Sequence, residues 1–447
     1  VSGNEEHVQT AIKNGAVAVL AQGAMGFRCE LSEHHQDMVP VFYNEQTQAL
    51  FATWLQRRYD IASMSLFAVT GTNGKSSITQ YIAQLLTLYN QPCAVIGTLG
   101  NGLWPKLEST VNTTPSLAVT LKSLSDCCAL GARYGALEVS SHGLVQKRVA
   151  GLSFNVAVMS NLSQDHLDYH ANMEDYFLAK RSLFVDYQVA FALINIDDEY
   201  GVRLAQDVEI KSQIITYGKS AKAQVRYQVQ EFGAHGIKAL LSSNWGEAEL
   251  SLPLIGEFNL ANATAAIATL ACQGFEFKKL CQLAAQLQPV AGRMELYHKA
   301  DAPTLVVDFA HTPDALRNVL TALKAYNQPI ATLFGCGGDR DRSKRPLMLQ
   351  AAQELSTTVW ITDDNPRFED PEQIFNDLLQ GQQDVIAVHD RKTAIANLIN
   401  SQTANTIILL AGKGHETYQD IQGVKYPYND GQYLQQLGYQ KLGGEHV

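Results

Sequence analysis

The stretch "VTGTNGKSS", from Val69 to Ser77, constrains the fold more than any other part of the chain. It follows the short apolar run "SLFAV", which is typical of a buried strand, and it precedes apolar residues that recur at helical spacing as far as Tyr89. A strand, a glycine loop and a helix in this order hold a phosphate through backbone N–H groups and the positive end of the helix. The alternative is a glycine turn that opens a helix by chance, because Val69 stands where the usual motif has glycine.

The loop also supplies side chains to a nucleotide. Lys75 is placed to reach the terminal phosphates, and the Ser76 hydroxyl is placed to bind Mg²⁺. The candidate phosphate-binding residues are Gly71, Thr72, Asn73, Gly74, Lys75, Ser76 and Ser77.

Composition narrows the class of protein. The 447 residues are enough for two or three domains, and 46% hydrophobic with 17% charged residues is typical of a soluble globular protein. The formal net charge of -10 argues against a broad nucleic-acid or membrane-surface footprint, so we expect neither partner. The seven cysteines are scattered and never spaced as CxxC, which argues against a disulfide framework or a zinc site and favours a cytoplasmic location.

Three segments differ in their pattern. Residues 1–45 hold too few elements for a stable domain, and we interpret them as the remainder of a small N-terminal domain that begins upstream of Val1. Residues 46–290 alternate strand-like and helical runs, with an antiparallel appendage in "QVRYQVQEFGAHGIKALLSSNWGEAELSLPL". Residues 291–447 have the pattern of parallel βαβ units, with helices expected near Pro313, Lys344, Pro371, Arg391 and Asn429. The predicted fold class is α/β, with a central phosphate-loop domain and a C-terminal doubly wound, Rossmann-like domain.

Polar clusters follow five predicted strands of the last segment. Ligands of such sheets bind beyond the carboxyl ends of the strands, so the coincidence predicts a polar cleft that faces the rest of the protein. The clusters are Asp308 with His311, Gly337 to Arg345, Asp363 to Arg367, His389 to Arg391, and Lys413 to Glu416.

Candidate metal ligands follow two central strands. Glu138 closes the run "YGALEV", where it is either a carboxylate that shares Mg²⁺ with Ser76 or a solvated residue at a strand end. The segment "NLSQDHLDYH" follows another strand, and a histidine among carboxylates there is either a metal ligand or a loop residue. Its candidates are Asp165, His166, Asp168 and His170.

Lys180 lies in the middle of the apolar stripe of the predicted helix "NMEDYFLAKRSLF". A lysine in that position either extends its ammonium to the surface or has a lowered pKa and a special use. A neutral amine near a metal can take up CO₂ and become an anionic carbamate ligand.

Two arginines stand at junctions. Arg293 lies between the second and third segments, where it is a linker cation or a residue that reaches a nucleotide phosphate when the domains close. Arg367 follows the rigid pair Asn365-Pro366, where its guanidinium can clamp a carboxylate. A capped turn explains Asp364, Asn365 and Pro366 but leaves the choice of Arg367 open.

These motifs together resemble the Mur ligase family of peptidoglycan synthesis. The motifs, in family order over residues 1–447, are "TGTNGKSS", "NTTPS", "LEVSSHGL", "NLSQDHLDYH", the lysine of "LAKRSLF", "GEFNLAN", "AGRME", "DFAHTPDAL", "GCGGDRDRSKRP", "DNPR" and "AGKGHE". The resemblance implies three domains and a cytoplasmic, monomeric ATP-dependent ligase that joins an amino acid to UDP-MurNAc-L-Ala-D-Glu through an acyl phosphate. A loop that recognises the uracil is expected upstream of Val1.

The resemblance also implies roles for individual residues. Lys75, Lys180, His166 and Glu138 would be catalytic, with Ser76, Glu138, His166 and carbamylated Lys180 around Mg²⁺. Asn259, Arg293 and Asp308 would join the phosphate loop in binding ATP. The UDP-linked substrate would contact Asn112, Thr113, Thr114, Ser140, Gln146 and Arg148. The amino-acid pocket would be formed by Arg345, Asp364, Asn365, Pro366, Arg367, Gly412 and Glu416.

The motif "DNPR" resembles family members that add meso-diaminopimelate rather than L-lysine, because Arg367 would pair with the distal carboxylate that lysine lacks. Two alternatives remain open at this stage. One is another ATP-dependent ligase with the same core, of the L-lysine-adding or folylpolyglutamate type. The other is a shortened chain that binds nucleotide without catalysis.

Overall fold

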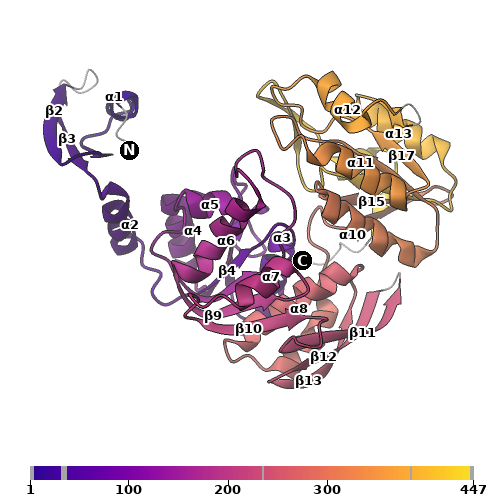
Figure 1. Ribbon diagram of the computed structural model, residues 1–447, viewed down its shortest axis with the longest axis horizontal. Coiled ribbons are helices and arrows are strands. Elements are labelled where there is room, and N and C mark those ends of the chain that lie inside the picture. The colour runs from indigo at the N-terminus through magenta and orange to yellow at the C-terminus, as the bar shows by residue number, and fades with distance from the viewer. Residues whose placement is uncertain (1–4, 32–37, 234–235, 383–384, 443–447) are drawn as a thin grey trace.

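The computed structural model describes residues 5–31, 38–233, 236–382 and 385–442. Within these ranges the chain forms a small N-terminal β-sheet, two large β-sheets that follow it along the sequence, and one two-stranded hairpin. The N-terminal sheet stands apart from the rest of the molecule, and helix α2 (Thr47–Arg58) leads from it to the central domain (Figure 1). The predicted boundaries at residues 45 and 290 stay predictions.

The N-terminal part is a small sheet covered by one helix. Its elements are α1 (Glu5–Lys13), β1 (Val19–Gln22), β2 (Gly26–Leu31) and β3 (Met38–Asn44), with β3 parallel to β1 and antiparallel to β2. Val8 and Ile12 of α1 pack against Val19 and Val41. This core is small, as the sequence predicted, whereas strand β2 was not predicted.

The central domain is built on a twisted sheet with β4 (Ser65–Thr70) at its middle. The strand order among the described residues is β13-β12-β11-β10-β9-β8-β4-β7-β5-β6. The other strands of its α/β part are β5 (Cys93–Gly97), β6 (Gly100–Leu103), β7 (Tyr134–Glu138), β8 (Ser153–Met159), β9 (Gln188–Asn195) and β10 (Gln213–Gly218). Strand β4 pairs in parallel with both β7 and β8, so the loops that follow these three strands meet at one edge.

Helices cover both faces of this sheet, because its strands carry apolar side chains on both faces. Phe67 and Val69 pack under α3 (Lys75–Leu88) and α8 (Glu257–Ala271), whereas Leu66 and Ala68 face the opposite layer. The remaining helices are α4 (Leu117–Ala129), α5 (Ser141–Val145), α6 (Met173–Val185), α7 (Glu199–Ala205) and α9 (Phe277–Leu283), followed by a 3-10 turn at Ala284–Gln286. The phosphate loop is therefore held by a strand and a helix that are both buried.

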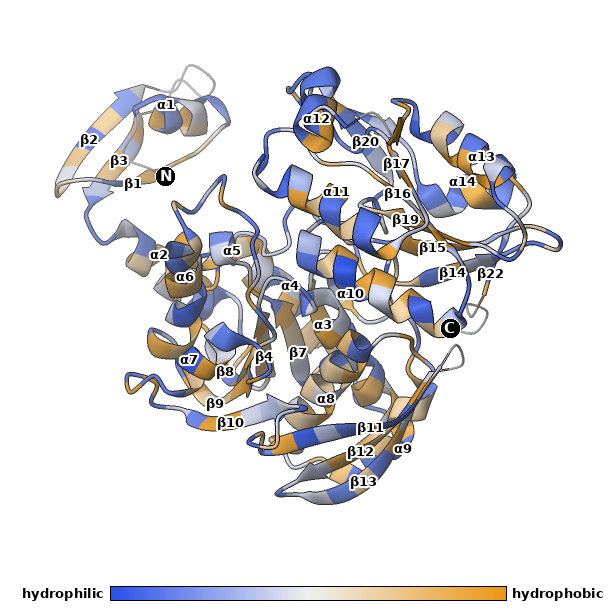
Figure 2. Cartoon of the chain, turned by 45° about the vertical axis from the view of Figure 1, so that its right-hand side comes forward, coloured by the Kyte–Doolittle hydropathy of each residue, from blue (hydrophilic) through white to orange (hydrophobic). Residues whose placement is uncertain are grey.

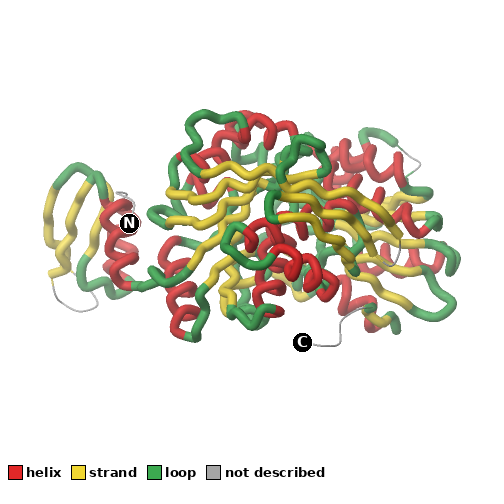
Figure 3. The backbone as a smooth tube through the Cα atoms, turned by 90° about the horizontal axis from the view of Figure 1, so that it is seen from below, coloured by secondary structure: helices red, strands yellow, loops and turns green. Residues whose placement is uncertain are grey.

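The predicted antiparallel appendage extends the same sheet. It comprises β11 (Val225–Gly233), β12 (Gly236–Ser243) and β13 (Gly246–Leu252), joined by antiparallel pairing. Seen from below, its strands continue the layer of the central strands (Figure 3).

The C-terminal domain has the predicted doubly wound core. Its strand order in the described residues is β18-β17-β16-β19-β15-β14-β22, and pairing is parallel from β18 to β15. The strands are β14 (Glu295–His298), β15 (Thr304–Asp308), β16 (Ile330–Phe334), β17 (Thr358–Ile361), β18 (Ile386–Ala387), β19 (Ile407–Ala411) and β22 (Gln440–Lys441). Strand β14 is antiparallel to its neighbours β15 and β22, a feature that the sequence reading did not include.

Amphipathic helices cover this sheet on both faces. They are α10 (Pro313–Leu323), α11 (Lys344–Leu355), α12 (Pro371–Leu379), α13 (Arg391–Ser401) and α14 (Asp430–Gln436), and four of them begin at the predicted residue. Helix α10 buries Leu316, Val319, Leu320 and Leu323, and its hydrophobic and hydrophilic residues separate clearly in Figure 2. A hairpin of β20 (Tyr418–Ile421) and β21 (Val424–Pro427) leaves this layer after β19. Within the described ranges, no helix combines the length and the apolar composition needed to cross a membrane.

Arg391 and Asp430 form a buried ion pair that fixes the start of α13 to the start of α14. The guanidinium donates to both carboxylate oxygens at 2.8 and 2.7 Å and to the Ala411 carbonyl at the end of β19. Both side chains are at most 1% exposed.

We expect Arg391→Met to destabilise the C-terminal domain by about 3–5 kcal/mol, because it leaves the Asp430 carboxylate buried without its cation. Hydrogen exchange of the β19 amides would measure the change. The matched control is Arg203→Met, which removes the exposed pair with Glu174 and should leave β19 unchanged. Equal protection of β19 in all three proteins would contradict the expectation.

Candidate active site

A cleft of about 430 Å³ lies between the central and C-terminal domains. Its central wall includes the phosphate loop, the end of β7 and the loops after β5, β6 and β8, and its C-terminal wall includes the loops after β15, β16, β17 and β19. The predicted site residues that line it are Thr72, Asn73, Gly74, Lys75, Ser76, Ser77, Thr113, Glu138, His166, Arg293, Asp308, Asp364, Asn365, Arg367, Gly412 and Glu416.

The phosphate loop has the backbone shape that its sequence predicted. Gly74 has a φ of +87°, which favours glycine, and a Cβ there would meet the Asn262 side chain. Lys75 donates to the carbonyls of Gly71 and Thr72, each at 2.8 Å, so its ammonium lies over the loop. Asn73 receives a hydrogen bond from Ser160, and its backbone N–H donates to Asn161 at 3.0 Å, so the loop after β8 braces the phosphate loop.

Glu138 is a buried carboxylate beside the start of α3. The Ser76 hydroxyl donates to it at 3.0 Å, and both the backbone and the hydroxyl of Thr98 donate to it at 2.9 and 3.0 Å. Burial raises the pKa of Glu138, and Lys75 opposes that shift. The alternative of a solvated strand-end residue is wrong, because Glu138 is 2% exposed.

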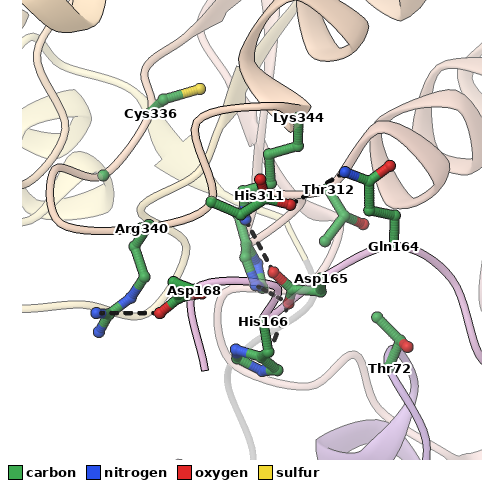
Figure 4. Close-up of polar contacts among 12 residues, drawn as sticks. Thr72, Gln164, Asp165, His166, Asp168, His311, Thr312, Cys336, Arg340 and Lys344 are labelled. Atoms are coloured by element: carbon green, nitrogen blue, oxygen red, sulfur yellow. Dashed lines mark hydrogen bonds and ion pairs between the residues drawn. The ribbon is translucent and has the colours of Figure 1, made fainter. Parts of the chain in front are cut away.

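Asp165 joins the two walls of the cleft (Figure 4). It accepts a hydrogen bond from Lys344 at 3.0 Å, and the His166 and His311 rings each approach its other oxygen to 3.5 Å. Burial opposes ionisation of this carboxyl, but Lys344 and the two histidines outweigh burial and hold its pKa well below the usual range. The anion is therefore shared by a cation of the C-terminal domain and a histidine of the central domain.

Further polar contacts accompany this pair. Gln164 donates to Asp341 and Ser343 at 3.0 and 2.9 Å, and Asn73 of the phosphate loop donates to Asp314 of α10 at 3.3 Å. All of them connect strand-end loops of one domain with helix starts of the other.

His166 and Lys180 both have lowered pKa values. Burial lowers the pKa of His166 to about 3, so its imidazole is neutral near pH 7. Lys180 is 1% exposed on the buried stripe of α6, donates to the Gly71 carbonyl at 2.9 Å, and lies 4.6 Å from the centre of the Tyr176 ring. Burial, and then Lys75, lower the pKa of Lys180 well below its usual value. The lysine does not extend to the surface, which was the simpler alternative.

The linker between the domains also reaches the cleft. The guanidinium of Arg293 lies 4.5 Å from the centre of the Phe309 ring, and Asp308 accepts hydrogen bonds from the backbone of Met294 and Ala310. A Cβ at Gly292 would collide with the backbone of Gly414 and His415, so the linker and the loop after β19 are in direct contact.

The C-terminal wall carries charges of both signs. Arg367 uses Nη1 to donate to the Gly338 carbonyl at 2.7 Å, and burial, followed by the nearby Arg340, lowers its pKa. Asp364 and Glu416 lie beside it, with Asn365 donating to Glu416 at 2.8 Å. The pocket therefore has a cationic side and an anionic side.

Two predicted residues lie elsewhere. Arg345 is 0% exposed and is paired with Glu369, Asp377 and the Gly337 carbonyl, so its side chain does not line the cleft, and its role in the amino-acid pocket stays a prediction. Arg340 is the arginine of that motif that lines the cleft. Asn259 is held by the Tyr81 hydroxyl and the Ile255 carbonyl, while Phe258 and Asn262 of the same helix line the cleft.

The residues predicted for the UDP-linked substrate form a separate connected group beside the cleft. Thr114 is linked to Ser140 at 3.1 Å and accepts from Arg148 through its carbonyl at 2.7 Å, and Arg148 also donates to Gln146. Thr113 connects the group to the cleft through Thr98. Asn112 is exposed, and Pro366 lies next to the cleft without lining it.

Several cleft residues were given no role from the sequence. Lys344 stands next to a residue that was assigned one, and Thr98 lies in a loop without a charged motif. The cluster of residues 337–345 pointed to the right loop, but the choice among its three arginines depended on which way each side chain faces.

The fold and the site define a phosphate-loop enzyme whose nucleotide site faces a Rossmann-like domain with a pocket for a small charged substrate. Family models agree with this class: the Mur ligase middle domain matches residues 69–270, and the glutamate ligase domain of Mur ligases matches residues 292–414.

Similar proteins extend the comparison over nearly the whole chain. The UDP-N-acetylmuramoyl-L-alanyl-D-glutamate--2,6-diaminopimelate ligase of Vibrio vulnificus is 42% identical, over 97% of this chain and 88% of the relative. The ligase of the same name from Pseudomonas putida is also 42% identical, over 95% and 88%. A solved structure of a ligase of this name aligns with a TM-score of 0.64 at 37% identity, covering 96% of this chain and 88% of that one.

A folylpolyglutamate synthase from Mycobacterium tuberculosis, complexed with ADP and AMPPCP, aligns with a TM-score of 0.67 at 17% identity, covering 81% of this chain and 91% of that one, which shows a shared fold alone. The chain belongs to the Mur ligase family. The predicted family, fold class and class of enzyme are confirmed.

The Asp165–Lys344 contact generates a prediction about domain association. We expect Asp165→Asn to weaken the contact between the domains by about 3–5 kcal/mol, because Lys344 stays buried without its anion. Small-angle scattering would then show a larger radius of gyration. The double variant Asp165→Leu/Lys344→Met should recover much of the compactness, since no buried charge is left unpaired. The control is Lys122→Met, which removes an exposed pair within α4. Scattering curves of Asp165→Asn that match the native protein would contradict the expectation.

Acid should destabilise the C-terminal domain through His415. Burial, and then Arg293, lower the pKa of His415 to about 3, below the usual value of about 6.5. Between these two values the unfolded chain binds one more proton than the folded chain, so the unfolding free energy falls as the pH falls from about 6.5 towards 3. In His415→Leu, we expect the slope of unfolding free energy against pH between 6 and 4.5 to decrease by up to about 1.4 kcal/mol per pH unit. Urea unfolding at several pH values measures this slope, and an unchanged slope would rule out the contribution.

Proposed function

We propose that this chain is the ATP-dependent ligase that joins meso-2,6-diaminopimelate to UDP-MurNAc-L-Ala-D-Glu in the cytoplasm, as one step of peptidoglycan precursor synthesis. One observation carries the proposal: a single cleft joins a phosphate loop to a pocket that has both a cationic and an anionic side. The names of the 42% identical relatives support the same substrates. We expect the protein to act as a monomer without nucleic-acid or membrane partners.

The reaction activates a carboxylate and then replaces phosphate by an amine. An oxygen of the D-Glu γ-carboxylate forms a bond to the γ-phosphorus of ATP, the bond from that phosphorus to the bridging oxygen breaks, and ADP leaves. The amine of diaminopimelate then attacks the acyl carbon, loses a proton and expels inorganic phosphate. A carboxylate alone reacts poorly because oxide is a poor leaving group, whereas phosphate is a good one.

Lys75 and the start of α3 are positioned for the phosphates. The Lys75 ammonium lies over the loop, and the N-terminus of α3 points its backbone N–H groups at the same space. Charge that develops on the transferred phosphoryl group is stabilised there by a fixed cation and fixed dipoles. Arg293 and Asp308 would complete the nucleotide site from the linker side.

The residues present fit Mg²⁺. The Ser76 hydroxyl and the Glu138 carboxylate are oxygen donors 3.0 Å apart, and neutral His166 lies on the same wall. The described residues contain no group of three or more histidine, cysteine or carboxylate side chains arranged to hold a metal ion by themselves. That suits Mg²⁺, which takes few protein ligands and completes its shell with phosphate and water. When bound, the ion would neutralise phosphate charge.

Lys180 suits the carbamate role because its amine is buried with a lowered pKa. A neutral amine can react with CO₂ by forming an N–C bond and releasing a proton. The resulting anion would lie beside Gly71 of the phosphate loop, where it would offset the positive charge of Lys75.

Arg367 and Glu416 are positioned to distinguish diaminopimelate from L-lysine. The distal end of diaminopimelate carries a carboxylate and an ammonium, which match the cationic and anionic sides of the pocket, whereas the distal end of L-lysine carries only the ammonium. The grouping of Thr114, Ser140, Gln146 and Arg148 supports a binding region for the UDP-linked substrate next to the cleft.

Phosphate release in the presence of ATP, Mg²⁺ and UDP-MurNAc-L-Ala-D-Glu tests the proposal. We expect release to require meso-diaminopimelate and to stay near background with L-lysine or without an amino acid. In Arg367→Met, the KM for meso-diaminopimelate should rise by about 30-fold or more, since a buried charge pair contributes about 2 kcal/mol or more.

The control Arg203→Met changes an exposed arginine far from the cleft and should leave the KM unchanged. Release driven best by L-lysine would show the L-lysine-adding type of ligase. No release with any amino acid would show a nucleotide-binding protein without this activity.

A further inference from the structure

Lys413 is a fully buried lysine that the reaction described above does not use. It follows β19 in the sequence "AGKGHE", and its side chain is 0% exposed. Its ammonium donates to Asn365 Oδ1 at 2.9 Å, to Glu416 Oε2 at 2.8 Å and to the Tyr418 carbonyl at 2.6 Å. The Asp364 carboxylate lies 3.5 Å away. All three N–H bonds are therefore used, and each partner belongs to a loop of the amino-acid pocket.

These contacts fix the orientation of the Asn365 amide. Because Lys413 is only a donor, the oxygen of Asn365 must face it, and the same oxygen accepts the backbone N–H of Asp420 at 2.9 Å. The amide nitrogen is then directed at Glu416 Oε2, to which it donates at 2.8 Å. Glu416 Oε2 consequently receives two hydrogen bonds, one from a cation and one from an amide.

The other oxygen of Glu416 remains for a ligand. Glu416 lines the cleft, and no donor among the described residues contacts its Oε1. Likewise, only Nη1 of the Arg367 guanidinium is engaged within the described ranges, by the Gly338 carbonyl. Lys413 itself does not line the cleft. It contacts the pocket only through residues such as Glu416 and Asn365, which line the cleft.

The charges of two neighbouring carboxylates give a second reason for a lysine at position 413. Asp364 and Glu416 are two carboxylates on one side of a small pocket, and like charges held close together resist ionisation. The Lys413 ammonium lies within 3.5 Å of both carboxylates and offsets that repulsion, while Glu416 Oε1 has no donor partner among the described residues. A buried lysine would be costly without such partners.

We propose that Lys413 is a positioning residue that sets amino-acid specificity by holding Glu416 and Asn365 in the geometry that receives the distal ammonium of the substrate. The proposal rests on the proposed function and deepens it. Arg367 selects for a carboxylate, whereas the Lys413 network presents one oriented carboxylate oxygen to an ammonium. Recognition of a distal group that has both charges needs both halves of the pocket.

The test is a double-mutant cycle with Lys413→Met and Glu416→Gln in the full-length chain. In Lys413→Met, we expect the KM for meso-diaminopimelate to rise about 10- to 100-fold, the range expected for a lost charged hydrogen bond, while the KM for ATP changes less than about twofold. If Lys413 acts through Glu416, the double variant should be no worse than Glu416→Gln alone. A KM that multiplies the two single effects would overturn the proposal.

Two controls separate positioning from general stability. Lys441→Met removes a lysine of the same domain, which pairs with Glu295 at the far edge of the sheet, and both KM values should stay unchanged. Direct binding of meso-diaminopimelate, measured by calorimetry with a non-hydrolysable ATP analogue and the UDP-linked substrate present, should weaken in Lys413→Met by the same factor as the KM. Equal losses for ATP and diaminopimelate would show a structural role and overturn the proposal.

The native chain, measured first, separates the two proposals. If it releases phosphate with meso-diaminopimelate and Lys413→Met has the native KM, only the role of Lys413 is overturned. If the native chain uses L-lysine instead, or no amino acid at all, the proposed function fails and the role of Lys413 fails with it.

Discussion

The arrangement of the candidate active site depends on a buried carboxylate that contacts residues of both domains. Asp165 lies in the loop after β8 of the central sheet. Its partners in the C-terminal domain are Lys344, at the start of α11, and His311, in the loop after β15. Because an unpaired charge at this depth would be costly, the two sheets are held with their carboxyl ends facing each other. The phosphate loop on one side and the charged pocket on the other become one cleft only under this constraint. The site therefore requires both domains in this arrangement, because neither domain alone supplies all of its residues.

Buried basic residues have different partners on the two sides of this cleft. His166 and Lys180 have lowered pKa values, so they can act as neutral nitrogen donors or nucleophiles near the phosphate loop. Lys413 is equally buried, but two carboxylates and two further oxygen acceptors surround its ammonium. The two buried lysines therefore differ in their partners, which the sequence alone did not indicate.

Local sequence patterns were sufficient to predict most of the fold, because strand–loop–helix units are marked by residues within each unit. The phosphate loop and the helix starts at Pro313, Lys344, Pro371 and Arg391 follow directly from glycine, proline and capping residues beside apolar runs. The direction in which each side chain points could not be predicted from these local patterns. Arg340 and Arg345 are five residues apart in one motif, yet one lines the cleft and the other is consumed by Glu369 and Asp377. For that reason the sequence did not show that the Arg345 and Asn259 side chains point away from the cleft wall. Lys413 was given no role of its own, because two of its partners, Asp364 and Asn365, come from a distant loop.

Gly292 in the linker between the domains contacts the Gly414–His415 backbone in the loop after β19, so these two segments must move together. A rotation of the C-terminal domain about residues 290–294 cannot leave the loop after β19 unmoved, because a space too small for a single Cβ cannot absorb the motion. Any side chain introduced at position 292 would therefore displace the linker and the loop after β19 together, and so would change domain orientation and the amino-acid pocket at once.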